Sequence, residues 1–178
     1  MDLQAHGHTA DVDRPLRYQT LADDIAGLIG HLGLAQADVM GYSFGGATAL
    51  RTAIQHPHLV RRLVLVSEPY QRDGWYPESV AGMEQMGSRL AEPLKQSPVY
   101  QVYANADAVR PEHIVRFYRL LGGGLRDASW DGSARSVTRL AILPGHTHYD
   151  TFASPELAAA VVPFLDAPSL EPPTPLTA

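Results

Sequence analysis

The sequence predicts an α/β fold, with a mostly parallel sheet that is covered by helices on both faces. Three observations support this fold class. Short apolar segments alternate with segments of helical periodicity along the chain. A serine bracketed by glycines stands between one predicted strand and the next helix. Polar residues that could carry chemistry follow two later strands, and ligands of parallel sheets bind at such strand ends.

The first half of the chain predicts helix, strand, helix and strand. Residues 18–34 place apolar side chains at helical spacing, and Gly33 ends that pattern. Residues 38–42 form a short segment that is apolar in the middle, and residues 44–55 again have helical periodicity. Residues 63–66 are β-branched and apolar, as expected of a buried parallel strand.

The same alternation returns in the second half. Residues 99–104 predict a strand, and residues 111–121 predict a helix that begins with proline. Residues 140–143 predict another strand, and residues 155–165 a last helix. We therefore expect one domain over residues 1–166.

Three segments are expected to lie outside this framework. Residues 69–98 mix aromatic and Met side chains with Gly and Pro, which suits either a lid over an apolar pocket or a plain surface insertion. Residues 122–136 form a second irregular stretch. The tail, residues 167–178, is rich in proline and poor in apolar residues, so we expect it to be disordered.

Composition narrows the classes of function. The 178 residues are 45% hydrophobic and 19% charged, with a net charge of -5 and no run of basic residues that would bind nucleic acid or anionic lipid. Cysteine is absent, which excludes disulfides, iron–sulfur clusters and cysteine nucleophiles. The first residues do not have the pattern of a signal peptide, and no stretch approaches about 18 consecutive apolar residues. We expect a cytoplasmic protein with no nucleic-acid or membrane partner.

The strongest chemical signal is the sequence Gly-Tyr-Ser-Phe-Gly-Gly at residues 41–46, between a predicted strand and a predicted helix. Gly-x-Ser-x-Gly in this setting is typical of a nucleophile, Ser43, on a sharp turn, where Gly41 and Gly45 leave room. The Phe44 amide at the start of the helix could stabilise the negative oxygen of a tetrahedral intermediate. The competing interpretation is a glycine turn with an incidental serine.

A serine nucleophile needs a base and an acid that orients the base. His148 lies just beyond the strand predicted at residues 140–143 and is the expected base. Asp107 follows another predicted strand and is the expected acid, because the order Ser43, Asp107, His148 is one that such sites use. The other candidate acids are Asp127, Asp131 and Asp150.

With these motifs, the chain resembles the carboxy-terminal two-thirds of an α/β-hydrolase of the serine esterase, lactonase and perhydrolase-like group. The sequence Asp-Leu-Gln-Ala-His-Gly-His-Thr at residues 2–9 is similar to the family's Asp-Leu-x-Gly-His-Gly-x-Ser/Thr loop. The segments that carry the resemblance are residues 2–9, 18–34, 41–46, 56–57 and 143–148. It covers residues 2–166, with a poorer match around residues 70–104.

The resemblance implies a reduced α/β-hydrolase fold that hydrolyses small carboxylic esters or lactones. It implies Ser43 as nucleophile, Asp107 as acid and His148 as base, and such a site requires no metal or organic cofactor. The expected oxyanion and substrate contacts are Phe44, Tyr42 and Trp75.

The resemblance also predicts a missing feature. In the family, an earlier strand carries a His-Gly loop with a second oxyanion amide, and this chain begins after that strand. Loss of one such donor slows catalysis by on the order of 100- to 1,000-fold. The strand at residues 38–42 would also lack its usual neighbour, and such a bare apolar edge predicts a homo-oligomer or a strand-exchanged dimer.

Two other functions compete with the esterase hypothesis. His146, His148 and Asp150 have a spacing found in the metallo-β-lactamase fold. His6 and His8 could add further zinc ligands, although that family's motif is incomplete here. The more serious alternative is a catalytically weak or inactive scaffold that binds a small apolar ligand or a partner protein.

Overall fold

The structure is a computed structural model of the whole chain, and it describes residues 1–76, 98–124 and 136–168. Most of the lid predicted at residues 69–98 and most of the predicted tail therefore lie outside the described residues. The same holds for most of the irregular stretch predicted at residues 122–136.

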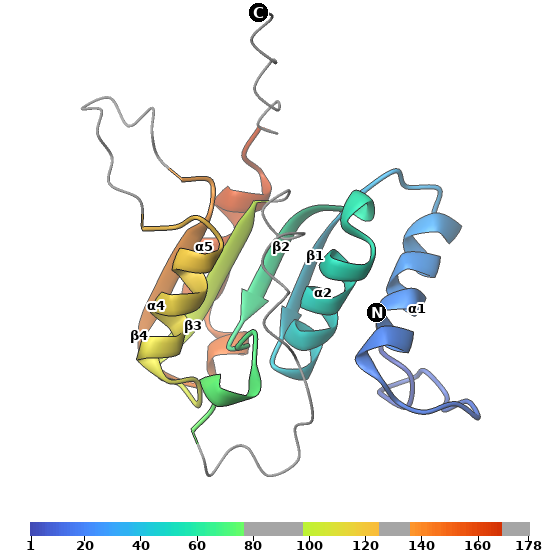
Figure 1. Cartoon of the computed structure of the whole chain (residues 1–178), viewed down its shortest axis with the longest axis horizontal. Coiled ribbons are helices and arrows are strands. Elements are labelled where there is room, and N and C mark those ends of the chain that lie inside the picture. Colours follow the sequence, from blue (N-terminus) through green and yellow to red (C-terminus); the bar gives the residue numbers. More distant parts are fainter. Residues whose placement is uncertain (77–97, 125–135, 169–178) are drawn as a thin grey trace, which may run out of the picture.

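Four parallel strands form one sheet in the order β1-β2-β3-β4 (Figure 1). Their bounds are β1 (Ala37–Tyr42), β2 (Val60–Val66), β3 (Val99–Ala106) and β4 (Arg139–Thr147). Each predicted strand is present, and the parallel sheet confirms the predicted fold class. Strand β4 runs past its predicted end because its pairing with β3 resumes after an irregularity, where Ala106 pairs with Thr147.

Helices cover both faces of this sheet. The described helices are α1 (Tyr18–His31), α2 (Phe44–Gln55), α4 (Pro111–Leu120) and α5 (Pro155–Leu165), with the 3-10 turns η1 (Pro57–Leu59), η2 (Arg72–Gly74) and η4 (Thr151–Ala153). Figure 1 shows α2 and α4 on one face, α5 on the other, and α1 outside against α2. Helix α1 ends just before Gly33, as predicted, and Gly33 has a φ of 68°. Within the described ranges, no helix is long and apolar enough to cross a membrane.

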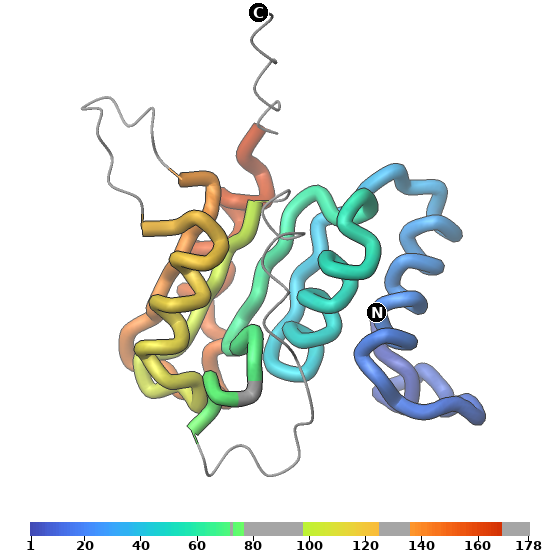
Figure 2. Tube along the Cα trace, in the orientation of Figure 1, coloured from blue at the N-terminus to red at the C-terminus, as the bar shows by residue number. Residues whose placement is uncertain are grey.

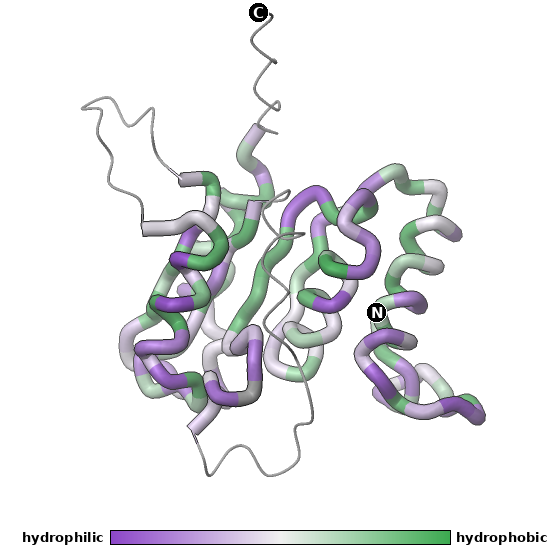
Figure 3. Tube along the Cα trace, in the orientation of Figure 1, coloured by the Kyte–Doolittle hydropathy of each residue, from purple (hydrophilic) through white to green (hydrophobic). Residues whose placement is uncertain are grey.

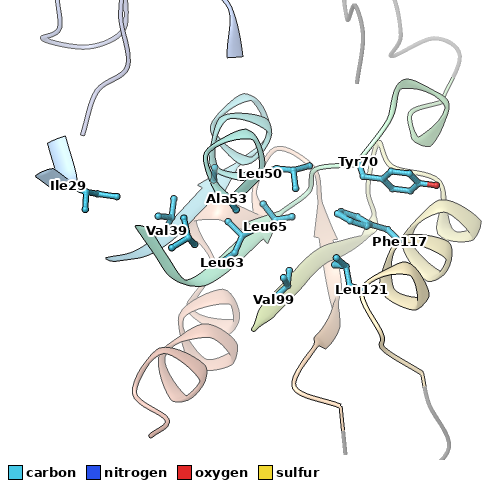
Figure 4. Packing of buried hydrophobic residues seen from close by; sticks show 12 residues of the cluster. Ile29, Val39, Leu50, Ala53, Leu63, Leu65, Tyr70, Val99, Phe117 and Leu121 are labelled. Carbon is cyan, nitrogen blue, oxygen red and sulfur yellow. The ribbon is translucent and has the colours of Figure 1, made fainter. Parts of the chain in front are cut away.

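Strand β2 lies between two hydrophobic cores, because successive side chains of a strand point to opposite faces. Leu63 and Leu65 pack beneath α2 and α4, where Leu50 and Phe117 meet them (Figure 4). On the other face, the core against α5 contains Val64, Val66, Leu157, Val161 and Phe164. The apolar course of β2 is visible in Figure 3. Burial on both faces explains why residues 63–66 of this strand are all apolar.

The carboxyl ends of the four strands lie along one edge of the sheet, the lower edge in Figure 2. Residues 1–17 lie near the same edge, where the His6 ring stacks on the Phe44 ring at the start of α2. This edge is where parallel α/β sheets bind their ligands.

Candidate active site

Ser43 stands on a strained turn between β1 and α2. Its φ is 48°, in the left-handed region that side chains rarely adopt. The turn is fixed on both sides, because the Ser43 amide donates to the Val66 carbonyl at 3.0 Å and the Ala47 amide donates to the Ser43 carbonyl at 3.0 Å. The hydroxyl makes no capping bond to α2, so it is available for chemistry.

Two glycines let the turn pack closely. A Cβ on Gly41 would lie 2.1 Å from the carbonyl oxygen of Gly45, and a Cβ on Gly46 would lie 2.8 Å from the Glu68 Cβ. By contrast, a Cβ on Gly45 would have no neighbour within 4 Å. The expectation that Gly45 leaves room is therefore wrong, and Gly46 makes the second close approach.

His148 connects Ser43 to Asp107. Its Nε2 lies 3.1 Å from Ser43 Oγ, and its Nδ1 lies 3.1 Å from Asp107 Oδ1. Because an ionised carboxylate only accepts hydrogen bonds, the ring proton belongs on Nδ1, and Nε2 can accept the proton of the Ser43 hydroxyl. The side chains of His148 and Asp107 are 9% and 1% exposed, so little water reaches this pair.

Asp107 is held by four hydrogen bonds. Its Oδ1 accepts from His148 Nδ1 and from the Val109 amide at 3.2 Å. Its Oδ2 accepts from the Ser67 hydroxyl at 2.6 Å and from the Ala104 amide at 3.0 Å. Burial by itself would raise the pKa of Asp107, but the bonds from His148, Ser67 and Ala104 outweigh it and hold this pKa below its usual value. The carboxyl is therefore ionised at neutral pH.

Asp150, another candidate acid, contacts Thr147 and His146 and not the His148 ring. Asp150 accepts from the amide and the hydroxyl of Thr147, at 2.7 and 3.1 Å. It also lies 3.7 Å from His146 Nδ1. The remaining two candidates, Asp127 and Asp131, lie outside the described residues.

The proposed zinc ligands are not brought together in the described structure. His146 lies beside Asp150 and Glu156, whereas His148 contacts Asp107 and Ser43. In the part of the chain that the structure describes, no group of three or more His, Asp or Glu side chains is placed to hold a metal ion.

Tyr42 and Trp75 both pack against the predicted base. The Tyr42 hydroxyl donates to the His148 backbone carbonyl, and the two rings lie 5.3 Å apart. The Trp75 ring meets the imidazole edge to face at 5.6 Å and is 7% exposed. Together they fix the position of the imidazole and cover it.

Phe44 lies on the other side of Ser43. Its ring is 36% exposed and contacts the rings of His6 and Tyr18, with centroids 5.5 and 5.1 Å away. Its amide is the first of helix α2, and the first amides of a helix have no partner within the helix. This amide can therefore donate to an oxygen held beside Ser43.

Sequence reasoning missed Ser67, although a signal for it was present. Ser67 is the residue directly after β2, just as Ser43, Asp107 and His148 directly follow β1, β3 and β4. All four strands thus place a polar side chain at the same edge of the sheet.

Sequence reasoning also missed Glu68, which is 1% exposed beneath the start of α2. Burial, with a smaller contribution from Asp107, raises the pKa of Glu68 well above its usual value. Its Oε1 has no hydrogen-bond partner in the described structure. The ionised form of this side chain is therefore disfavoured.

The sequence of residues 1–117 matches the family model of the alpha/beta hydrolase fold. This chain belongs to the α/β-hydrolase family. The resemblance inferred from the motifs is thereby confirmed.

Curated relatives of this α/β-hydrolase include enzymes with different substrates. A 2-(acetamidomethylene)succinate hydrolase of Mesorhizobium japonicum is 30% identical over 143 residues, which are 78% of this chain and 51% of that protein. A mouse sn-1-specific diacylglycerol lipase is 38% identical over 69 residues, which are 37% of this chain and 21% of that protein. The matches thus span about half of these relatives or less.

Solved structures show the same fold. An E-2-(acetamidomethylene)succinate hydrolase superposes with a TM-score of 0.66 at 21% identity, over 93% of this chain and 80% of that one. An enol-lactonase from Burkholderia xenovorans LB400 gives a TM-score of 0.64 at 19% identity, over 93% of this chain and 79% of that one. The chain therefore has a reduced form of the α/β-hydrolase fold, as predicted.

Proposed function

We propose that this α/β-hydrolase cleaves small carboxylic esters or lactones through an acyl-enzyme on Ser43. The observation that carries the proposal is the continuous series of hydrogen bonds from Ser43 through His148 to Asp107. The hydroxyl is within reach of a base, and that base is oriented by a buried, ionised acid.

In the first half of the reaction, Ser43 Oγ attacks the carbonyl carbon while His148 Nε2 takes the hydroxyl proton. Asp107 stabilises the imidazolium that forms, and the Phe44 amide donates to the negative oxygen of the tetrahedral intermediate. The intermediate collapses as the carbon–oxygen bond to the alcohol breaks. His148 returns its proton to the departing alkoxide.

In the second half, water replaces the alcohol. His148 Nε2 takes a proton from the water, whose oxygen attacks the acyl carbon, and the same amide stabilises the second intermediate. Ser43 leaves with the proton that His148 held. The products are the carboxylic acid and the free enzyme, and neither half needs a metal or an organic cofactor.

The nucleophile and the relatives support this substrate class. A serine forms an acyl ester with a carbonyl compound, whereas haloalkane and epoxide substrates call for a carboxylate nucleophile. The names of the relatives include an enol-lactonase and a diacylglycerol lipase. These two names favour an ester or lactone carbonyl here.

The test compares wild type with Ser43→Ala. We expect wild type to hydrolyse p-nitrophenyl acetate and to gain the mass of one fluorophosphonate adduct. Ser43→Ala is expected to lose the adduct and on the order of a million-fold in kcat. The matched control is Ser154→Ala, which removes a serine whose hydroxyl caps α5 by accepting from the Leu157 amide at 3.1 Å. The fluorophosphonate should label this control as it labels wild type.

The opposite results support a different function. The esterase proposal would be rejected if Ser43→Ala still hydrolysed the ester. It would also be rejected if wild type gained no fluorophosphonate adduct. A catalytically inactive scaffold that binds a small apolar ligand would then be the better account.

We also propose that the protein is a cytoplasmic homo-oligomer that pairs along β1. In the described sheet β1 has a neighbour on one side only, and the Met40 side chain on this strand is 47% exposed. Light scattering at micromolar concentration should give a mass above that of one chain, and a clean monomer would count against pairing. Fractionation of native cells tests the compartment.

A further inference from the structure

The hydrogen bonds of the candidate site extend one residue beyond Asp107. Ser43, His148, Asp107 and Ser67 form a continuous series, and each is the residue directly after one of the four described strands. The last link joins Ser67 Oγ to Asp107 Oδ2 at 2.6 Å, a distance that is typical of the strong bond from a hydroxyl to a carboxylate.

The backbone at Ser67 is strained, as it is at Ser43. Its φ is 53°, a region that side chains rarely adopt, whereas glycine would adopt it freely. The Ser67 amide donates to the Val102 carbonyl of β3 at 2.9 Å, and the residue is fully buried. The strained conformation directs the hydroxyl to the carboxylate, and a glycine could not supply this bond.

We propose that Ser67 is a positioning residue of the hydrolytic site, which acts through Asp107 by holding its carboxylate ionised and turned toward His148. This inference rests on the proposed function. The hydroxyl bonds Oδ2, and so it leaves Oδ1 to face the His148 ring. Without it, the Ala104 amide would be the only remaining donor to Oδ2 in the described structure.

Two effects of losing the hydroxyl act in the same direction. The carboxylate would be less stabilised in its charged form, so it would protonate at higher pH. The carboxylate would also be held by fewer hydrogen bonds, so it would accept less firmly from His148 Nδ1. The other ionisable groups that face Asp107 are Tyr42, Glu68 and Tyr103. The pKa of each of these groups is raised, and all three are present in both wild type and Ser67→Ala, so a difference between the two acid limbs reports the loss of the Ser67 hydroxyl.

The experiment measures the rate of Ser43 labelling by a fluorophosphonate against pH. In this step Ser43 Oγ bonds to phosphorus, fluoride leaves, and His148 takes the proton, so the rate reports activation of the nucleophile. We expect Ser67→Ala to slow labelling roughly 10- to 100-fold at neutral pH and to move the acid limb to higher pH. Ser67→Gly should show the same loss while unfolding at a higher urea concentration than Ser67→Ala, because glycine relieves the strained φ.

The matched control is Thr138→Val. Thr138 is also buried, and its hydroxyl donates to the Leu121 carbonyl at 2.8 Å, at the amino end of β4. This variant should lose stability but keep the wild-type labelling rate and acid limb. An acid limb in Ser67→Ala that stays in place, or moves to lower pH, would overturn the inference.

A second readout separates this inference from the proposed function. The tautomer of the His148 ring, read by nitrogen NMR, requires no turnover. In Ser67→Ala the share of the form with its proton on Nδ1 should fall, because the carboxylate that accepts this proton is held less firmly. If wild type never labels, the proposed function fails, and the inference is decided by the tautomer alone. An unchanged His148 tautomer in Ser67→Ala overturns it.

Discussion

The two sides of Ser43 are built in different ways. On the base side, His148, Asp107 and Ser67 come from different strands, and each hydrogen bond joins residues 40 to 105 positions apart in sequence. On the oxyanion side, the key groups are Gly41, the Phe44 amide and Gly46, which lie within six consecutive residues.

This difference separates two kinds of requirement. The base side depends on tertiary packing, because strands that are distant in sequence must bring their ends together. The oxyanion side depends on local backbone geometry, where a single Cβ would collide with the turn. Substitutions should therefore affect mainly chemistry on the base side and mainly folding on the oxyanion side.

After Ser43→Ala, the largest effect is expected for Asp107→Asn. The amide cannot hold the His148 ring in the correct tautomer, so kcat for p-nitrophenyl acetate should fall on the order of 10,000-fold while urea unfolding changes little. Asp150→Asn is the matched control, because this carboxyl contacts Thr147 and His146 and not the His148 ring. Equal losses in the two variants would show that the acid has been assigned to the wrong residue.

The next effect is expected for Gly41→Ala on the oxyanion side. Its Cβ would overlap the Gly45 carbonyl, and the free energy of unfolding should fall by about 3 kcal/mol in urea titrations. Gly45→Ala carries the same added methyl into open space and should stay within about 1 kcal/mol of wild type. A Gly45→Ala protein as unstable as Gly41→Ala would contradict the structure of the turn.

We expect low pH to destabilise the fold on the base side of the site through protonation of His113. This residue stacks on Tyr70 and lies against Gly74 of η2, one residue before Trp75, which covers His148. Burial lowers the pKa of His113 from 6.5 to about 4, while Asp73 opposes this shift and Arg110 and Arg116 add to it.

The unfolded chain thus binds more protons than the folded one between pH 6.5 and 4, and stability falls as pH falls through this window. Urea titrations should show a loss of up to about 3 kcal/mol, which His113→Gln reduces. An identical pH dependence in both proteins would assign the loss to other groups.

The smallest effect is expected for Glu68→Gln on the oxyanion side. The raised pKa of Glu68 means that the folded state holds this proton above the usual pKa of 4.5, so stability falls as pH rises above that value. Glu68→Gln removes the free-energy cost of ionising a buried carboxyl. This variant should therefore be more stable than wild type at pH 9 by on the order of 1 kcal/mol. If wild type is the more stable protein at pH 9, the buried carboxyl must have a partner.

Much of this arrangement could be predicted from the sequence. Strands, helices and the order Ser43, Asp107, His148 follow from apolar periodicity and from polar residues at strand ends. The bond from Ser67 to Asp107 was missed, because the two residues lie 40 positions apart and the position of Ser67 directly after a strand is its only sequence signal. Sequence reasoning also chose Gly45 instead of Gly46 as the second crowded glycine. The crowding at Gly46 comes from a distant group, the Glu68 side chain.

The placement of one site residue after each strand has a consequence for the order of folding. His148 belongs to the end of the last strand, which must dock on β3 before the imidazole can approach Ser43. Under the proposed mechanism, Ser43 therefore lacks its base until β4 docks on β3. Recovery of the proposed activity during refolding should coincide with this docking.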